Sequence, residues 1–176
     1  MLIGYDILIV DGYNVIHQWL EMKFLKPGEL DYTRQQLITI LSSIVGFWGF
    51  QCLLVFDAHL VNNGKGSTEQ INNNLQVIFT PEKQTADNLI ERLAVEFCSQ
   101  NISVLVCTSD KAEQNIVLSL GANRISAREL LREVKLAQCE MKRHYGRHPK
   151  TQQRSWLEDS LPLDIKEALR HLREKK

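Results

Sequence analysis

The sequence predicts an α/β protein: a three-layer sandwich with a mostly parallel sheet of four or five strands, followed by a C-terminal helical extension. Residues 7–10 form an apolar, mostly β-branched run without polar alternation, which is typical of a strand buried on both faces. Strand-like and helix-like stretches then alternate, which implies right-handed crossovers. Three of the strand-like stretches run into an aspartate, namely Asp11, Asp57 and Asp110. Ligands of open α/β sheets bind outside the carboxyl ends of the strands, so these carboxylates predict a site there.

The other elements follow from hydrophobic periodicity and from the residues that interrupt it. Apolar residues three and four positions apart predict amphipathic helices, and the helix that begins at Thr85 has the clearest apolar stripe. Residues 62–67 predict a loop, whose Gly-Lys pair lacks the spacing of a phosphate-binding loop. Strands are expected over 52–56, 75–79, 102–107 and 124–125, and helices over 14–23, from 31 to the glycines at 46 and 49, from 85, over 110–121 and over 126–141.

The composition changes after residue 141, which predicts a globular domain over 1–141 and a separate C-terminal segment over 142–176. Residues 142–154 contain five basic residues and no acidic one, together with glycine and proline, and we interpret them as a linker or arm. Residues 162–173 place apolar side chains at helical spacing and predict a final helix.

The net charge of zero conceals an uneven distribution of charge. Residues 128–176 hold 13 basic and 8 acidic residues, which leaves 8 basic and 13 acidic residues in the part before them. An acidic body with a basic tail fits a cation-binding site beside a surface that binds a polyanion. A basic helix that is merely solvated is the plain alternative.

The composition is that of an ordinary globular protein, with 44% hydrophobic and 24% charged residues. The longest apolar runs are strand-length, and the N-terminus lacks a signal-peptide pattern, so no membrane partner is expected. The four cysteines lie in apolar or helical stretches without a C-x-x-C pair, which favours reduced core cysteines. We therefore expect a cytoplasmic protein, and an organellar stroma remains a possible alternative location.

Carboxylates gathered at one edge of a sheet are the candidate functional residues. Asp11, Asp57, Asp87 and Asp110 would repel one another unless a cation compensated their charge. Hard oxygen ligands without a thiolate or imidazole cluster select Mg²⁺ or Mn²⁺. Such ions activate water and neutralise charge on a phosphoryl group, so the pattern points to a phosphodiesterase. Asn14 would orient a ligand or water there, or merely cap the first helix.

Each of these acids also has a simpler structural interpretation. Asp110 begins a capping-box pattern, and Asp87 lies in the first turn of a helix, where the dipole favours any carboxylate. Asp57 precedes a loop and would suit a turn. Asp11 is the hardest to explain in this way, because an acid, a glycine and an amide directly after a buried strand would be costly without a function.

Five motifs that occur in order resemble those of the YacP-like NYN proteins, a branch of the PIN-like nucleases. They lie at residues 10–14, 55–59, 79–87, 108–110 and 126–130, within a match over about residues 6–140. The resemblance implies a PIN-like Rossmannoid sheet, Mg²⁺ or Mn²⁺ as cofactor, and endoribonucleolytic cleavage of single-stranded RNA. For the best-known bacterial members it also implies action on messenger RNA associated with the ribosome.

Carried over by motif, the metal-binding acids are Asp11, Asp87 and Asp110, and Asp57 is a further acid of the family pattern. The hypothesis that follows is attack on phosphorus by metal-activated water, with the ribose 3′-oxygen as leaving group. Tyr13 or Tyr145 would stack a base. The RNA backbone would be bound by the basic residues of the C-terminal part, an assignment that rests on charge alone: Arg128, Arg132, Lys142, Arg143, Arg147 and Lys150.

Other classes of protein remain open at this point. A non-catalytic module that binds RNA or the ribosome would keep the fold without the reaction, although RNA binding alone favours a neutral or basic groove. A receiver domain would also have a phosphoacceptor at a strand end, which here would be Asp57, and a lysine at about the position of Lys111. Receivers need paired acids after the first strand, however, and here Asp11 is followed by glycine and tyrosine. A structural partner protein would leave the clustered acids unexplained.

Overall fold

A computed structural model describes residues 4–57, 66–108 and 121–145 of the chain. The chain divides into two units, Met1–Cys139 and Glu140–Lys176, and only residues 140–145 of the second are described. The helices expected over 110–121 and 162–173 therefore lie outside the described residues. In the part of the chain that is described, no helix combines the length and the apolar character needed to cross a membrane.

The described residues form one sheet of six strands, which confirms the α/β fold class. Every pair of neighbouring strands is parallel except the hairpin of β3 and β4. The spatial order is β3-β4-β2-β1-β5-β6. The strands are β1 (Ile7–Asp11), β2 (Gln51–Phe56), β3 (Ser67–Asn72), β4 (Leu75–Phe79), β5 (Val104–Cys107) and β6 (Asn123–Ile125).

Strand β1 lies at the centre of the sheet, as its sequence predicts. It pairs with β2 on one side and β5 on the other, in registers that place Val10 opposite both Leu54 and Cys107. Leu8, Ile9 and Val10 have no exposed surface, so both faces of this strand are buried.

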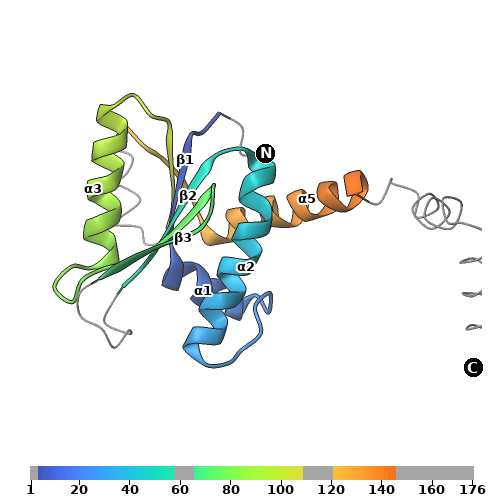
Figure 1. Ribbon diagram of the computed structural model, residues 1–176. Coiled ribbons are helices and arrows are strands. Elements are labelled where there is room, and N and C mark those ends of the chain that lie inside the picture. Colours follow the sequence, from blue (N-terminus) through green and yellow to red (C-terminus); the bar gives the residue numbers. More distant parts are fainter. Residues whose placement is uncertain (1–3, 58–65, 109–120, 146–176) are drawn as a thin grey trace, which may run out of the picture. The chain divides into compact units, whose positions relative to one another are not determined.

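The helices form the two outer layers. Figure 1 shows α3 on one face of the sheet and α1 and α2 on the other. Under α3, buried residues of three strands pack with Leu89, Ile90 and Ala94 of the helix in one apolar core. This arrangement confirms the three-layer sandwich. The helices are α1 (Gly12–Glu21), α2 (Leu30–Trp48), α3 (Ala86–Ser99) and α5 (Ala127–Tyr145).

Strand β3 is the sixth strand, and the sequence did not predict it. Its side chains are almost all exposed and polar, so it carries no hydrophobic alternation. Pairing with β4 holds it in place, and so does Asn72, whose side-chain oxygen accepts hydrogen bonds from the N–H groups of Asn74 and Leu75, both at 2.8 Å. The Asn72 amide also donates to Ser42 Oγ of α2 at 3.0 Å.

Three helix boundaries differ by two residues or more from those expected, including the end of α1, which is Glu21 rather than residue 23. Helix α1 begins at Gly12 rather than at Asn14, because Asp11 is its N-cap. Helix α5 continues past Met141 to Tyr145, so the prediction that a linker begins at residue 142 is wrong for the first four of its residues. Its last turn contains lysine, arginine and histidine, and cations at this position interact favourably with the helix dipole.

The start of α5 is fixed to α1. Trp19 is completely buried and its Nε1 donates a hydrogen bond to the carbonyl oxygen of Ala127 at 2.8 Å. Ser126 and Glu129 form the expected capping box, in which the N–H of Glu129 donates to Ser126 Oγ and the N–H of Ser126 donates to Glu129 Oε2. The first turn of α5 therefore has a defined position beside α1.

Candidate functional site

The carboxyl ends of the parallel strands meet at one edge of the sheet, and three of the predicted acids lie there. Asp11 is the last residue of β1, and Asp57 directly follows β2. Asp87 lies in the first turn of α3, the helix that follows β4. Helices α1 and α5 begin at this same edge, after β1 and β6. We call this edge, defined by Asp11, Asp57 and Asp87, the acidic edge.

Asp11 is partly buried, and its surroundings raise its pKa to about 6. Burial is the largest cause, and the negative charges of Asp87 and Asp57 raise the pKa further. The N–H groups of Asn14 and Tyr13 act in the opposite direction by hydrogen bonding to the carboxylate, the former at 3.1 Å from Oδ1. The ionised carboxylate is therefore costly at this place.

Asp57 connects the end of β2 to the beginning of α3. Its Oδ2 accepts a hydrogen bond from the N–H of Ala86 at 3.4 Å. Thr85 caps the same helix, since its Oγ1 accepts from the N–H of Asn88 at 3.3 Å. Asp87, the next residue after Ala86, is consequently held on the first turn of α3 close enough to Asp11 to affect its pKa.

Two of the three predicted metal ligands, Asp11 and Asp87, lie among the described residues. Among the residues that the structure describes, no three His, Cys, Asp or Glu side chains form a group that could hold a metal ion. Asp110, the third predicted ligand, lies outside the described residues. The donors of the acidic edge are carboxylate oxygens, which suit Mg²⁺ or Mn²⁺ rather than a soft metal.

The other predicted site residues divide into four groups. Asn14 lies beside Asp11 and contacts its carboxylate through the backbone N–H. Arg128 and Arg132 are exposed on α5, as are Lys142 and Arg143 in its last turns. Tyr13 lies in the first turn of α1, and Tyr145 is the last residue of α5. Arg147 and Lys150 lie outside the described residues.

Lys135 extends the basic face of α5 that Arg128 and Arg132 begin. The three residues are spaced by four and three positions and therefore share one side of the helix. The Lys135 ammonium lies 5.4 Å from the centre of the Phe24 ring, a cation–π contact that orients it. Lys135 was not among the predicted RNA-binding residues, although its spacing from Arg128 and Arg132 is visible in the sequence.

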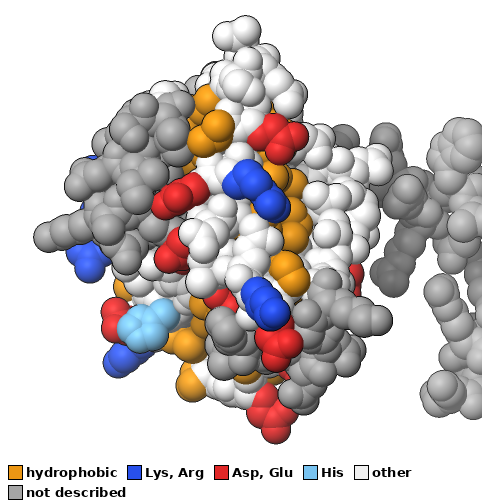
Figure 2. Space-filling view, turned by 90° about the vertical axis from the view of Figure 1, so that its left-hand side faces the viewer, with side chains coloured by type: hydrophobic (Ala, Val, Ile, Leu, Met, Phe, Trp, Pro, Cys, Tyr) orange, Lys and Arg blue, Asp and Glu red, His pale blue; other side chains and the backbone are white. Residues whose placement is uncertain are grey.

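The side of the molecule that carries α3 has a different charge pattern. Figure 2 shows acidic and basic side chains next to one another on this side. Charges of mixed sign do not provide a continuous path for a polyanion. The basic face of α5 is therefore the better candidate for contact with a nucleic acid.

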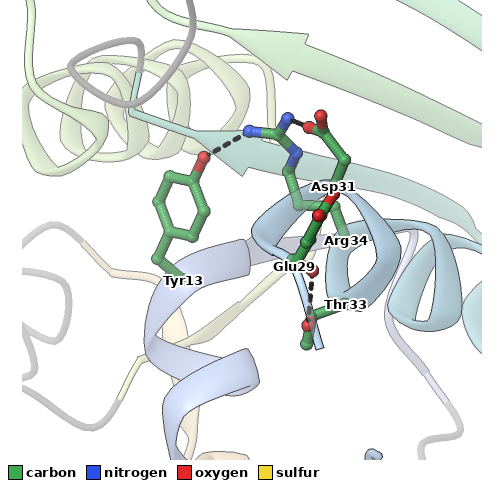
Figure 3. Close-up of polar contacts among 5 residues, drawn as sticks. All are labelled: Tyr13, Glu29, Asp31, Thr33 and Arg34. Atoms are coloured by element: carbon green, nitrogen blue, oxygen red, sulfur yellow. Dashed lines mark hydrogen bonds and ion pairs between the residues drawn. The ribbon is translucent and has the colours of Figure 1, made fainter. Parts of the chain in front are cut away.

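The structure also places an arginine, which the sequence did not single out, near the acidic edge. Figure 3 shows Arg34 of α2 between Tyr13 and Asp31. Its Nη1 donates a hydrogen bond to the Tyr13 hydroxyl at 2.8 Å, and its Nη2 pairs with Asp31. The guanidinium carbon lies 5.6 Å from the centre of the Phe79 ring. No local pattern marks this residue, because its contacts join distant parts of the chain.

Known proteins resemble this chain along most of its length. The model of the YacP-like NYN domain matches residues 8–174. The protein YacP of Bacillus subtilis (strain 168), described as uncharacterized, is 42% identical over 139 residues, which are 78% of this chain and 80% of YacP.

Solved structures agree with this match. The crystal structure of Rae1 (YacP) from Bacillus subtilis gives a TM-score of 0.69 at 35% identity and covers 97% of this chain and 95% of that one. A mutant of the same protein gives a TM-score of 0.65 at 39% identity, covering 78% and 80%. The family match continues to residue 174, well beyond the last recognisable motif at residues 126–130. Together with the close relative, it shows that this chain belongs to the YacP-like NYN domain family.

Proposed function

We propose that this protein is a divalent-metal-dependent endoribonuclease that hydrolyses single-stranded RNA. Its family has a PIN-like nuclease fold, and such nucleases typically use divalent metals. The observation that carries the proposal is the position of Asp11, which is partly buried, has a raised pKa and lies near Asp57 and Asp87.

This electrostatic arrangement favours a bound cation. Burial and two neighbouring carboxylates all oppose the ionised form of Asp11. A fold that needed only a helix cap could use an uncharged asparagine at this position at little cost. A divalent cation would instead favour the ionised form of Asp11, because it stabilises several carboxylates together. A partly buried carboxylate with a raised pKa, lying beside two further acids, is accordingly a sign of function.

The acids have distinct roles in this proposal. Asp11, Asp87 and Asp110 would hold one or two Mg²⁺ or Mn²⁺ ions. Asp57 fixes the start of α3, and with it Asp87, by accepting the N–H of Ala86. The N–H of Asn14 orients the carboxylate of Asp11. When bound, the ions would lower the pKa of a water molecule and neutralise charge on the phosphate.

The RNA strand would be held by helix ends and basic side chains. The N-termini of α1, α3 and α5 lie at the acidic edge, and helix N-termini favour phosphate groups. Arg128 and Arg132 of α5, together with Lys142, Arg143, Arg147 and Lys150, would bind the backbone. Tyr13 or Tyr145 would stack a base. We propose cytoplasmic messenger RNA, on the ribosome, as the substrate in cells.

The test compares Asp11→Asn with Asp6→Asn. Asp6 precedes β1 at the opposite end of the strand, where its Oδ2 accepts the N–H of Ser103 at 2.8 Å. An end-labelled unstructured RNA is incubated with each protein in Mg²⁺, in Mn²⁺ and in EDTA. Because metal-assisted stabilisation of the transition state amounts to several kcal/mol, we expect Asp11→Asn to lose at least about 100-fold in rate. Asp6→Asn should cleave like the parent, and EDTA should stop cleavage.

Cleavage by Asp11→Asn at the parent rate in Mg²⁺ would contradict the proposal. A parent protein that binds RNA but does not cleave it with either metal would instead identify the non-catalytic module.

A further inference from the structure

We propose that Arg34 binds a phosphate group of the RNA strand, and that Asp31 occupies its guanidinium group in the absence of RNA. The inference rests on the proposed function and adds to it a substrate-binding residue outside the acidic edge. In this proposal Arg34 contacts the phosphodiester backbone of the strand rather than a base.

The position of Arg34 follows from three aromatic residues at strand ends. Tyr13 lies two residues after Asp11, Phe56 directly precedes Asp57, and Phe79 ends β4. Their rings are in contact, with 5.0 Å between the centres of Tyr13 and Phe56 and 5.5 Å between those of Phe56 and Phe79. Because these rings continue directly from the residues of the acidic edge, the guanidinium that they support lies beside it.

The guanidinium is held in a fixed orientation. Its Nη1 donates to the Tyr13 hydroxyl, and its guanidinium carbon lies over the Phe79 ring. The Arg34 side chain is only 12% exposed, so little of its rotational freedom remains to be lost on binding. Arginine offers donors in a rigid fork that matches the oxygens of a phosphate group. A preorganised arginine is suited to binding an anion.

An anion already occupies the outer side of this arginine. Nη2 of Arg34 pairs with the carboxylate of Asp31, one turn earlier on α2 (Figure 3). The Asp31 side chain is 82% exposed, so its carboxylate can turn away from Arg34 without disturbing the core. Water screens the Asp31 side of this ion pair, which weakens the attraction of the carboxylate for Arg34. A phosphate oxygen can therefore replace the carboxylate oxygen at the same nitrogen atom.

The experiment measures binding of a short fluorescein-labelled oligouridine by fluorescence anisotropy, in EDTA and over a range of KCl concentrations. Arg34→Gln removes the cation, Arg34→Lys keeps the charge without the fork, and Asp31→Asn removes the competing carboxylate. Arg92→Gln is the matched control, since it removes one exposed cation from α3 on the other face of the sheet. Circular dichroism establishes that each variant is folded.

We expect the slope of log K against log salt to become less negative by about 0.7 in Arg34→Gln, because one phosphate contact is lost. Arg34→Lys should keep the parent slope with weaker binding. Asp31→Asn should bind roughly threefold more tightly, because a competing ion pair of marginal strength has been removed. Arg92→Gln should keep the parent slope and affinity.

Two results would overturn the inference alone. One is an unchanged slope in Arg34→Gln, or, if that variant does not fold, weaker binding by Asp31→Asn, which would give the ion pair a structural role. The other is the same loss of slope in Arg92→Gln as in Arg34→Gln. A parent protein that binds the oligonucleotide neither in EDTA nor with Mg²⁺ added would overturn both this inference and the proposed function.

Discussion

At the scale of single residues, the local sequence predicted the acids and did not predict their arginine neighbour. Asp11 and Asp57 were identifiable because an acid directly after a buried strand is a local signal, and the structure places both at the carboxyl edge. Arg34 carries no such signal, because its hydrogen bond to Tyr13 spans 21 positions of the chain. Contacts of this length depend on how α1 and α2 pack, which no short pattern encodes.

The raised pKa of Asp11 predicts how stability depends on pH. The folded-state pKa is about 6, against a usual value of 3.8. Between these two values the folded protein binds more protons than the unfolded one, so the free energy of unfolding falls as the pH rises from about 4 to about 6. The loss is complete above pH 6 and amounts to at most about 3 kcal/mol.

Asp11→Asn removes the fall in the free energy of unfolding that ionisation of Asp11 causes, and it keeps a good N-cap residue. In EDTA at pH 7.5 we therefore expect the variant to unfold at a higher urea concentration than the parent, and at pH 4 the two should be nearly equal. Urea unfolding monitored by circular dichroism measures both. A variant that is less stable than the parent at pH 7.5 would show that burial of Asp11 carries no electrostatic cost.

At the scale of elements, what could be predicted depended on how each element buries its side chains. Strand β1 and helix α3 have clear apolar patterns and were expected close to where they lie. Strand β3 has almost no buried side chain and is held by backbone pairing and by Asn72, so its sequence resembles that of a loop. The end of α5 was placed too early because its last turns are polar, although no residue in them breaks a helix.

Packing between α1 and β2 explains the glycine that follows Asp11. Gly12 is buried, and a Cβ atom at this position would meet the ring of Phe56. This ring contacts those of Tyr13 and Phe79, so it cannot move without disturbing both. Close approach of the helix to the strand therefore requires a glycine here.

Gly12→Ala should destabilise the protein by about 1–3 kcal/mol, because overpacking forces the surrounding rings to shift. The matched control is Gly46→Ala in α2, where an added Cβ meets nothing within 4 Å. Alanine in an open helical position should stabilise the protein by about 0.5–1 kcal/mol. Thermal unfolding of the two variants tests the pair. A Gly12→Ala variant as stable as the parent would contradict the packing argument.

At the scale of the whole molecule, the fold brings together acids from distant parts of the chain. Asp11 and Asp57 stand at the ends of β1 and β2, and Asp87 lies in the first turn of the helix that follows β4. Their approach depends on the order of the strands rather than on any single motif. Alternation of strands and helices predicted the shared edge, because parallel strands bring their carboxyl ends together. The local sequence did not show the separations between the side chains, because these depend on the packing of all three layers.

The central claim is that this edge captures a divalent cation, and calorimetric titration with Mn²⁺ in the absence of RNA tests it most directly. We expect the parent and Asp6→Asn to bind Mn²⁺ alike. Asp11→Asn and Asp87→Asn should each bind at least about tenfold more weakly, because each lacks one carboxylate ligand. Mn²⁺ binding of equal strength in all four proteins would contradict the account.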